Sequence, residues 1–156
     1  MEGKQYLKIS LFLKKQPHVS DEFFHKHWET QHVDVAMRNK TFLAKARKYN
    51  QVHITPELRE QAAAFGIPVM DYDGIAEVWV DSLEDWNEVL SDPAFVKEVG
   101  GEWEKRDRSR GVRGQVTDVL PADEQLFILA PIHVQLSYDR LVIPGSQAAQ
   151  VGTTEA

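Results

Sequence analysis

Three histidines in one short stretch, His25, His27 and His32, are the first residues of this sequence that suggest chemistry. On a helix, His25 and His27 would point about 200° apart, and His25 and His32 would lie about 10.5 Å apart along the axis. One metal ion cannot bind all three. The chain also lacks cysteine and any His-x-x-x-His pair, so we predict no metal site and expect His25 and His27 to be surface or edge residues.

His32 and His53 are the candidate proton donors. His32 shares a helix face with Trp28 and falls at the expected end of that helix, where the helix dipole favours an imidazolium. It could equally be a capping histidine that only binds the last carbonyl groups. His53 and Tyr49 lie on the same face of a predicted strand and form a second candidate acid–base pair, although a single histidine on a strand is more often structural.

Carboxylates gather before and within another predicted strand. Asp71-Tyr72-Asp73-Gly74 precedes it, and Glu77 and Trp79 share one of its faces. Carboxylates beside aromatic rings can have raised pKa values and act as acids or bases. Asp73 also fits ordinary Asp-Gly turn chemistry, and a salt bridge to Lys8 across the sheet would explain Glu77 without any catalytic role.

The elements that must position these side chains follow from periodicity and capping residues. Predicted strands cover 6–14, 46–54, 75–81 and 126–129, with 115–120 as a further candidate. Predicted helices cover 21–32, 56–65, 83–90 and 93–99, and residues 33–45 form a loop or a short helix. Because strand–helix–strand order occurs twice, we predict an α+β fold with a ferredoxin-like antiparallel sheet and helices on one face. His133 follows the last of these strands and could reach a cavity.

The first strand places Leu7, Ile9, Leu11 and Leu13 on the face that helices would cover. The opposite face of the sheet would combine aromatic and polar side chains: Tyr6, Lys8, Phe12, Tyr49, Gln51, His53, Glu77 and Trp79. Such a face is too apolar for simple exposure to solvent. Two copies packed sheet to sheet would cover it and leave a cavity in each half, so we expect a homodimer.

Composition excludes several classes of protein. The length of 156 residues suits one domain, which we place at 1–132, followed by an extension at 133–156 whose end is flexible. The net charge of −6 disfavours nucleic acid and anionic lipid as partners. No stretch resembles a signal peptide or a membrane span, which suggests a cytoplasmic protein. Glycine-rich nucleotide motifs and the Gly-x-Ser-x-Gly elbow are absent.

Two stretches resemble the EthD domain family. The first is Lys8-Ile9-Ser10-Leu11-Phe12 with the run from Ser20 to Trp28 and His32. The second is Tyr49-Asn50-Gln51-Val52-His53 with the run from Asp71 to Val80 and Ser82 to Trp86. Within that family the sequence is similar to a fungal branch from aromatic-polyketide biosynthesis, and in particular to decarboxylases of the atrochrysone carboxylic acid type. The similarity covers about Lys4 to Val99 and is weaker beyond it, where the Arg-rich segment 105–110 departs from the pattern.

The resemblance implies a dimeric α+β barrel and cofactor-free decarboxylation of a polyketide-derived aromatic or pre-aromatic acid. It implies that His32 and His53 act as general acid and enolate stabiliser, assisted by Tyr49. The other residues it assigns to the substrate are Phe12, Trp28, Tyr72 and Trp79 around the ring and Asp73 and Glu77 as orienting carboxylates, with His133 as a further candidate. A cyclase or dehydratase, a cofactor-independent oxygenase and a non-catalytic polyketide-binding protein remain as alternatives.

Overall fold

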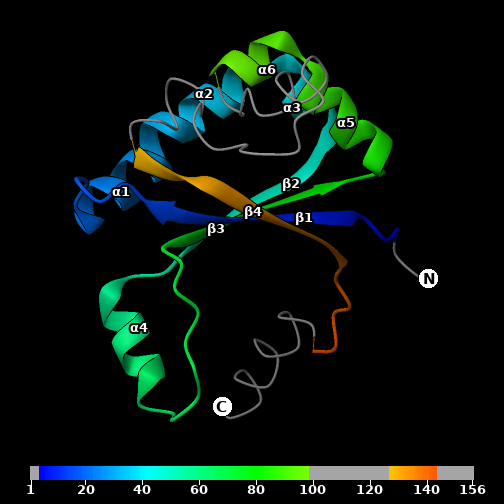
Figure 1. The fold of residues 1–156 in the computed structure, drawn as a ribbon. Coiled ribbons are helices and arrows are strands. Elements are labelled where there is room, and N and C mark those ends of the chain that lie inside the picture. The colour runs from blue at the N-terminus through cyan, green and yellow to red at the C-terminus, as the bar shows by residue number, and fades with distance from the viewer. Residues whose placement is uncertain (1–3, 99–126, 144–156) are drawn as a thin grey trace, which may run out of the picture.

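A four-stranded antiparallel sheet organises the protein, in a computed structural model that describes residues 4–98 and 127–143 (Figure 1). The strands are β1 Leu7–Lys15, β2 Ala46–His53, β3 Gly74–Val80 and β4 Ile128–Tyr138. Their spatial order is β2-β3-β1-β4, and all neighbouring pairs run antiparallel. This order is that of the ferredoxin-like split β-α-β arrangement, so the predicted fold class is confirmed.

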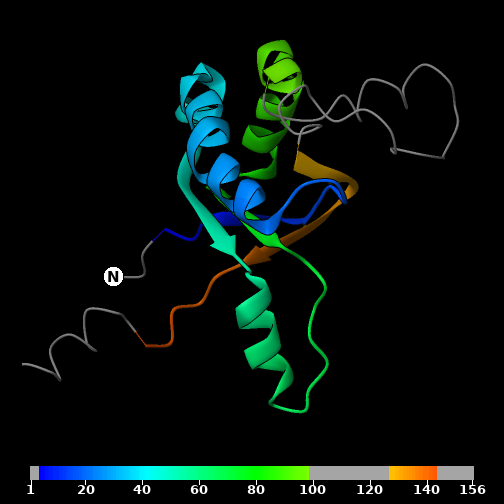
Figure 2. The ribbon, with the colours of Figure 1, turned by 90° about the vertical axis from the view of Figure 1, so that its left-hand side faces the viewer.

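Helices cover one face of the sheet, and one helix stands apart from them. The helical segments are α1 Asp21–His27, η1 Trp28–His32, α2 Val33–Arg38, α3 Lys40–Lys45, α4 Pro56–Ala63, α5 Leu83–Ser91 and α6 Pro93–Glu98. All except α4 lie on the same side of the sheet. Helix α4 extends beyond the opposite side in both views (Figures 1 and 2). That opposite side is called the open face below.

The first helical run is longer than predicted. It begins where Ser20 accepts a hydrogen bond from the backbone N–H of Phe23, continues through the π-helical turn η1, and ends at Asn39. The expectation that His32 ends a helix is therefore wrong. No glycine or proline follows His32 to stop the helix, and Ala36 in the next turn is buried in the core.

Two apolar clusters between the sheet and the helices form the core. One contains Ile9, Val78 and Val80 with side chains of α2, α3, α5 and α6. The other contains Leu13, Phe24, Trp28, Phe127 and others. The predicted inward face of β1 is confirmed, since Leu7, Ile9, Leu11 and Leu13 all belong to or pack against these clusters.

The two faces of strand β2 are directed to the sides of the sheet opposite to those predicted. Tyr49 is paired with Val78 and packs on the core, whereas Asn50 is paired with Glu77 on the open face. Tyr49, Gln51 and His53 therefore face the helices and not the open face. Both faces of β2 mix polar and apolar side chains, so alternation alone could not decide the direction. Packing decides which face of β2 is directed at the helices, because the Tyr49 ring meets Phe42 edge to face at 5.8 Å.

Strand β4 runs past the predicted end at residue 129. It continues through Pro131 to Tyr138, so His133 lies within the strand and the boundary expected after residue 132 falls inside it. A proline within a strand pattern indicates either an edge strand or no strand at all. Strand β4 is at the edge of the sheet, and its register against β1 shifts nearby, between Phe12 and Lys14. The predictions for 100–114, 115–120 and the tail from 144 lie outside the described residues. Within the described ranges, no helix has the length and apolar character needed to cross a bilayer.

Candidate functional site

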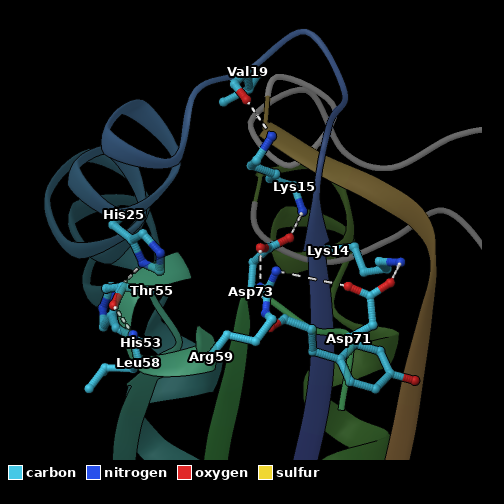
Figure 3. Close-up of polar contacts among 11 residues, drawn as sticks. Lys14, Lys15, Val19, His25, His53, Thr55, Leu58, Arg59, Asp71 and Asp73 are labelled. Atoms are coloured by element: carbon cyan, nitrogen blue, oxygen red, sulfur yellow. Dashed lines mark hydrogen bonds and ion pairs between the residues drawn. The ribbon is translucent and has the colours of Figure 1, made fainter. Parts of the chain in front are cut away.

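Two imidazole rings meet between α1 and the end of β2 (Figure 3). The Nδ1 atoms of His25 and His53 lie 2.7 Å apart, and the two rings have centroids 4.9 Å apart. The sequence predicts His53 as a candidate but places His25 on the surface, whereas His25 is partly buried. At this separation the pair can hold one shared proton between its Nδ1 atoms.

Gln51 determines which nitrogen of each ring carries a proton. Its Nε2 group donates to the carbonyl oxygen of Trp28 at 3.0 Å and to the hydroxyl of Tyr49 at 3.0 Å. Because a carbonyl only accepts, the side-chain oxygen of Gln51 must be the end that faces His53 Nε2, at 3.0 Å. We infer that His53 Nε2 carries hydrogen, that His53 Nδ1 accepts, and that His25 Nδ1 donates to it.

With this assignment the outer nitrogen of His25, Nε2, carries no hydrogen and has a free lone pair. His25 Nε2 is buried and has no hydrogen-bond partner within 4–98 and 127–143. Trp28 Nε1 is likewise a buried donor without a partner in these ranges. Both rings pack on His53, with centroid distances of 4.9 and 4.6 Å. Buried polar atoms of folded proteins are nearly always paired, so an unpaired base and an unpaired donor around one histidine point to a functional site.

Aromatic rings surround the His25–His53 pair. The Phe24 ring meets His25 edge to face at 5.0 Å and lies tilted against Trp28 at 5.7 Å, and both Phe24 and Trp28 are fully buried. Trp28 is the only one of the predicted ring-binding residues that lies beside this pair; its indole is held against β3, where Gly74 leaves room for it. The low polarity of these rings disfavours a charged imidazole.

His53 should make stability depend on pH. Burial lowers the pKa of His53, the neighbouring His25 lowers it further, and Glu29 opposes both. The folded protein therefore binds fewer protons here than the unfolded chain, whose histidine pKa is ~6.5, and this contribution to stability is lost as the pH falls below that value. We expect the free energy of unfolding in urea to fall between about pH 7 and about pH 5. His53→Gln should flatten this dependence, whereas substitution of the exposed His18 should not; equal slopes in both variants would contradict the assignment.

His32 also lies on the helix side of the sheet, but it packs on a different residue from the His25–His53 pair. It is buried, with 6% of its surface exposed, and its ring meets Phe127 edge to face at 5.4 Å. His27 also packs on Phe127, at 4.7 Å, and is 5% exposed, so the expectation of a surface position for His27 is wrong. Of the three residues predicted to be catalytic, His53 and Tyr49 are joined through Gln51, and His32 packs on the residue that precedes β4.

A groove runs along the outer edge of β2, beside Tyr49 and Gln51. It has a volume of about 510 Å³ and is lined by residues 46–51 of the strand and by Val33, Met37, Phe42 and Leu43. Its helix side is apolar, and Arg47 and Lys48 are among the strand residues that line it. Tyr49 and Gln51 therefore belong both to the groove wall and to the hydrogen-bonded chain that ends at His25.

Asp73 has a structural role at the base of α4. Its carboxylate accepts hydrogen bonds from the backbone N–H of Lys15 at 2.8 Å and from the Arg59 guanidinium at 2.8 Å (Figure 3). Arg59 also donates to the carbonyl of Tyr72 at 3.0 Å. These contacts attach α4 to β1 and to the start of β3, which accounts for the Asp73 carboxylate without reference to a substrate.

The other predicted substrate-binding residues lie on the open face. Tyr72 packs on Phe12 with centroids 5.1 Å apart, and its hydroxyl lies 3.3 Å from His133 Nδ1. The predicted salt bridge between Lys8 and Glu77 is confirmed. Trp79 donates from Nε1 to Asp139 at 2.7 Å. The sheet itself separates these residues from the His25–His53 pair, because paired strand residues alternate between its two faces.

Sequence reasoning misses His25 and Gln51 as site residues. It considers His25 only as a member of a possible metal-binding set with His27 and His32, and otherwise as a surface or edge residue. A signal for its position is present, since His25 precedes Trp28 by three residues and such residues are neighbours on a helix. No group of three or more His, Cys, Asp or Glu side chains in the described ranges is placed to hold a metal ion.

Comparisons with known proteins identify the family of this chain. Residues 16–105, which are 90 of the 156, match the EthD domain. Among solved structures, the fold is similar to an EthD family protein of Bacillus halodurans C-125, with a TM-score of 0.48 and 12% sequence identity over 86% of this chain and 99% of that chain. No protein with a curated description matches significantly. Because the domain match spans more than half of the sequence, this chain belongs to the EthD domain family.

Proposed function

We propose that this protein is a cofactor-independent decarboxylase that acts on a polyketide-derived aromatic or pre-aromatic carboxylic acid. The observation that carries the proposal is the partly buried His25–His53 pair, whose outer nitrogen, His25 Nε2, is buried and lacks a partner among the described residues. A neutral base in an aromatic setting can remove a proton from an acid or enol and return it to carbon. The resemblance of the sequence to polyketide decarboxylases supplies the substrate class.

The proposed reaction is a balanced transfer of one proton. His25 Nε2 accepts the proton of the substrate carboxylic acid, and the positive charge is shared with His53 through the Nδ1 hydrogen bond. The carbon–carbon bond to the carboxylate then breaks, CO₂ leaves, and the electron pair remains on the substrate as an enolate. The same proton returns from His25 Nε2 to that carbon. The apolar surroundings of Phe24 and Trp28 favour the step in which the carboxylate charge disappears.

The groove beside β2 supports a substrate of several fused rings. Its volume of about 510 Å³ falls within the range of small-molecule sites, roughly 300–1,000 Å³. Its apolar side, with Met37, Phe42 and Leu43, suits an aromatic body. In this proposal Tyr49 orients the substrate, Gln51 holds His53 in one tautomer, and His53 and His25 carry the proton.

Product analysis tests the proposal directly. The purified protein, treated with a chelator, is incubated with a panel of polyketide aromatic carboxylic acids, and products are identified by mass spectrometry. A mass loss equal to CO₂ that disappears in the His53→Gln variant supports decarboxylation. A loss equal to water would replace it with a dehydratase or cyclase. Retention of an unchanged acid on the protein would identify a binding protein instead.

A further inference from the structure

One buried hydrogen-bond donor beside the His25–His53 pair has no part in the proton transfer proposed above. This donor is the indole N–H group of Trp28. Trp28 is fully buried, and its Nε1 atom has no hydrogen-bond partner within 4–98 and 127–143. An indole N–H group donates and cannot accept, so only an acceptor atom can satisfy it. Because buried donors of folded proteins are nearly always paired, this N–H group marks a position where a ligand atom can bind.

The sheet fixes the orientation of the Trp28 indole. Cζ3 and Cη2, at the far end of its six-membered ring, lie in the space that a side chain at Gly74 would occupy. Nε1 belongs to the five-membered ring, through which the side chain is attached to the helical backbone. Nε1 therefore lies at the end of the indole away from Gly74, nearer to the helical run that also carries His25.

Trp28 Nε1 and the unpaired base belong to one site. His25 and Trp28 are three residues apart on the helical run, and their rings pack on His53 with centroid distances of 4.9 and 4.6 Å. The side chain of Gln51 contacts both the carbonyl oxygen of Trp28 and His53 Nε2. Trp28 also begins the π-helical turn η1, and such turns are frequent at functional sites. One unpaired donor and one unpaired acceptor therefore flank the same imidazole ring.

Decarboxylation requires a donor of this kind. When CO₂ leaves, the electron pair of the broken bond stays on carbon, and a carbonyl group on the next carbon stabilises it by taking the charge onto oxygen as an enolate. His25 then holds the proton that returns to carbon, so a separate group must bind the enolate oxygen. A fixed N–H group in aromatic surroundings binds such an oxygen strongly, because no water competes with it and it need not reorient.

We propose that Trp28 Nε1 donates a hydrogen bond to the substrate oxygen at the carbon β to the carboxyl group and holds that oxygen as it becomes an enolate. The substrate class then narrows to a β-keto acid or its enol form, which includes aromatic acids with a hydroxyl group ortho to the carboxyl group. No proton leaves Trp28, because the acid proton moves to His25 Nε2 and returns to carbon. This inference rests on the proposed decarboxylation, but its binding step can be measured without turnover.

Nuclear magnetic resonance of the nitrogen-labelled full chain tests the hydrogen bond directly. The chain has four tryptophans, and Trp28→Phe identifies the indole N–H signal of Trp28 among them. The probe is a hydroxynaphthoic acid whose hydroxyl group is beside its carboxyl group. Its binding should move the Trp28 N–H proton signal downfield by more than any other indole signal. A naphthoic acid that lacks the hydroxyl group should not produce this shift.

Turnover of a β-keto acid separates the hydrogen bond from packing. Trp28→Phe keeps an aromatic ring beside Phe24 and His53 but removes the N–H group. We expect kcat to fall by about 10²-fold or more, the usual loss when one oxyanion donor is removed. KM should change little, because the bond strengthens only as charge develops on the oxygen. The matched control is Trp86→Phe, which removes a buried indole from the other apolar cluster and should keep the natural kcat.

The outcomes distinguish this inference from the proposed function. The absence of a downfield shift up to the solubility limit of the hydroxynaphthoic acid, or equal shifts with both acids, would overturn the role of Trp28. A natural kcat in Trp28→Phe would also overturn it. If the natural protein releases no CO₂ from any β-keto acid, the decarboxylase proposal fails, and the indole shift decides the role of Trp28. If Trp28→Phe does not fold, variants of the other three tryptophans assign the Trp28 signal by elimination, and the shift again decides.

Discussion

His25→Gln should lower the rate of decarboxylation by about 10²-fold or more, the usual contribution of a positioned acid or base. Glutamine can still reach His53 with one polar group, but it cannot accept and return a proton. His53→Gln should have an effect of similar size, because His53 shares the charge that forms on His25. The double variant should lose little more than either single variant, since the two residues act as one unit.

The matched control is His18→Gln, which removes an exposed histidine that precedes α1. Its turnover should equal that of the natural protein. Gln51→Glu offers a second readout that a purely structural effect would not produce. A carboxylate beside His53 Nε2 should raise the pKa of His53 and shift the pH–rate profile to higher pH. Full activity of His25→Gln would remove His25 from the mechanism.

Gly74→Ala should destabilise the protein by ~3 kcal/mol, the upper part of the range for overpacking a core. A Cβ atom at Gly74 would lie 2.5 Å from Cζ3 and 2.9 Å from Cη2 of Trp28, and 3.2 Å from the carbonyl oxygen of Val52. Trp28 cannot move easily, because it is fully buried and its carbonyl accepts from Gln51. Urea unfolding followed by tryptophan fluorescence measures the loss.

Gly66→Ala is the control for this substitution. Gly66 has a φ of +74°, and no heavy atom lies within 4 Å of the position that a Cβ atom would take. Alanine there meets backbone strain of ~1 kcal/mol without a clash. Gly74→Ala should also lower activity, because displacement of the Trp28 ring disturbs its contact with His53, whereas Gly66→Ala should not. A stability loss at Gly74 no larger than that at Gly66 would show that the Trp28 region can relax.

The local elements of this protein are readable from its sequence. Ser20, Thr55 and Ser82 have the residue types and positions of helix caps, and each accepts a hydrogen bond from a backbone N–H three residues later. Capping depends on residues within one turn, so the sequence contains the whole interaction. The inward face of β1 is equally clear, because four large apolar residues alternate with others over a single strand.

Tertiary structure alone decided the candidate site. The direction of Tyr49, Gln51 and His53 depends on which face of β2 packs on Phe42 and Trp28, and both faces have similar polarity. His25 gained its partner only because α1 lies over the end of β2, at a separation of 28 residues. The extension of β4 beyond Pro131 depends on its position at the sheet edge. These features arise from contacts between segments distant in the chain, which periodicity within one segment cannot report.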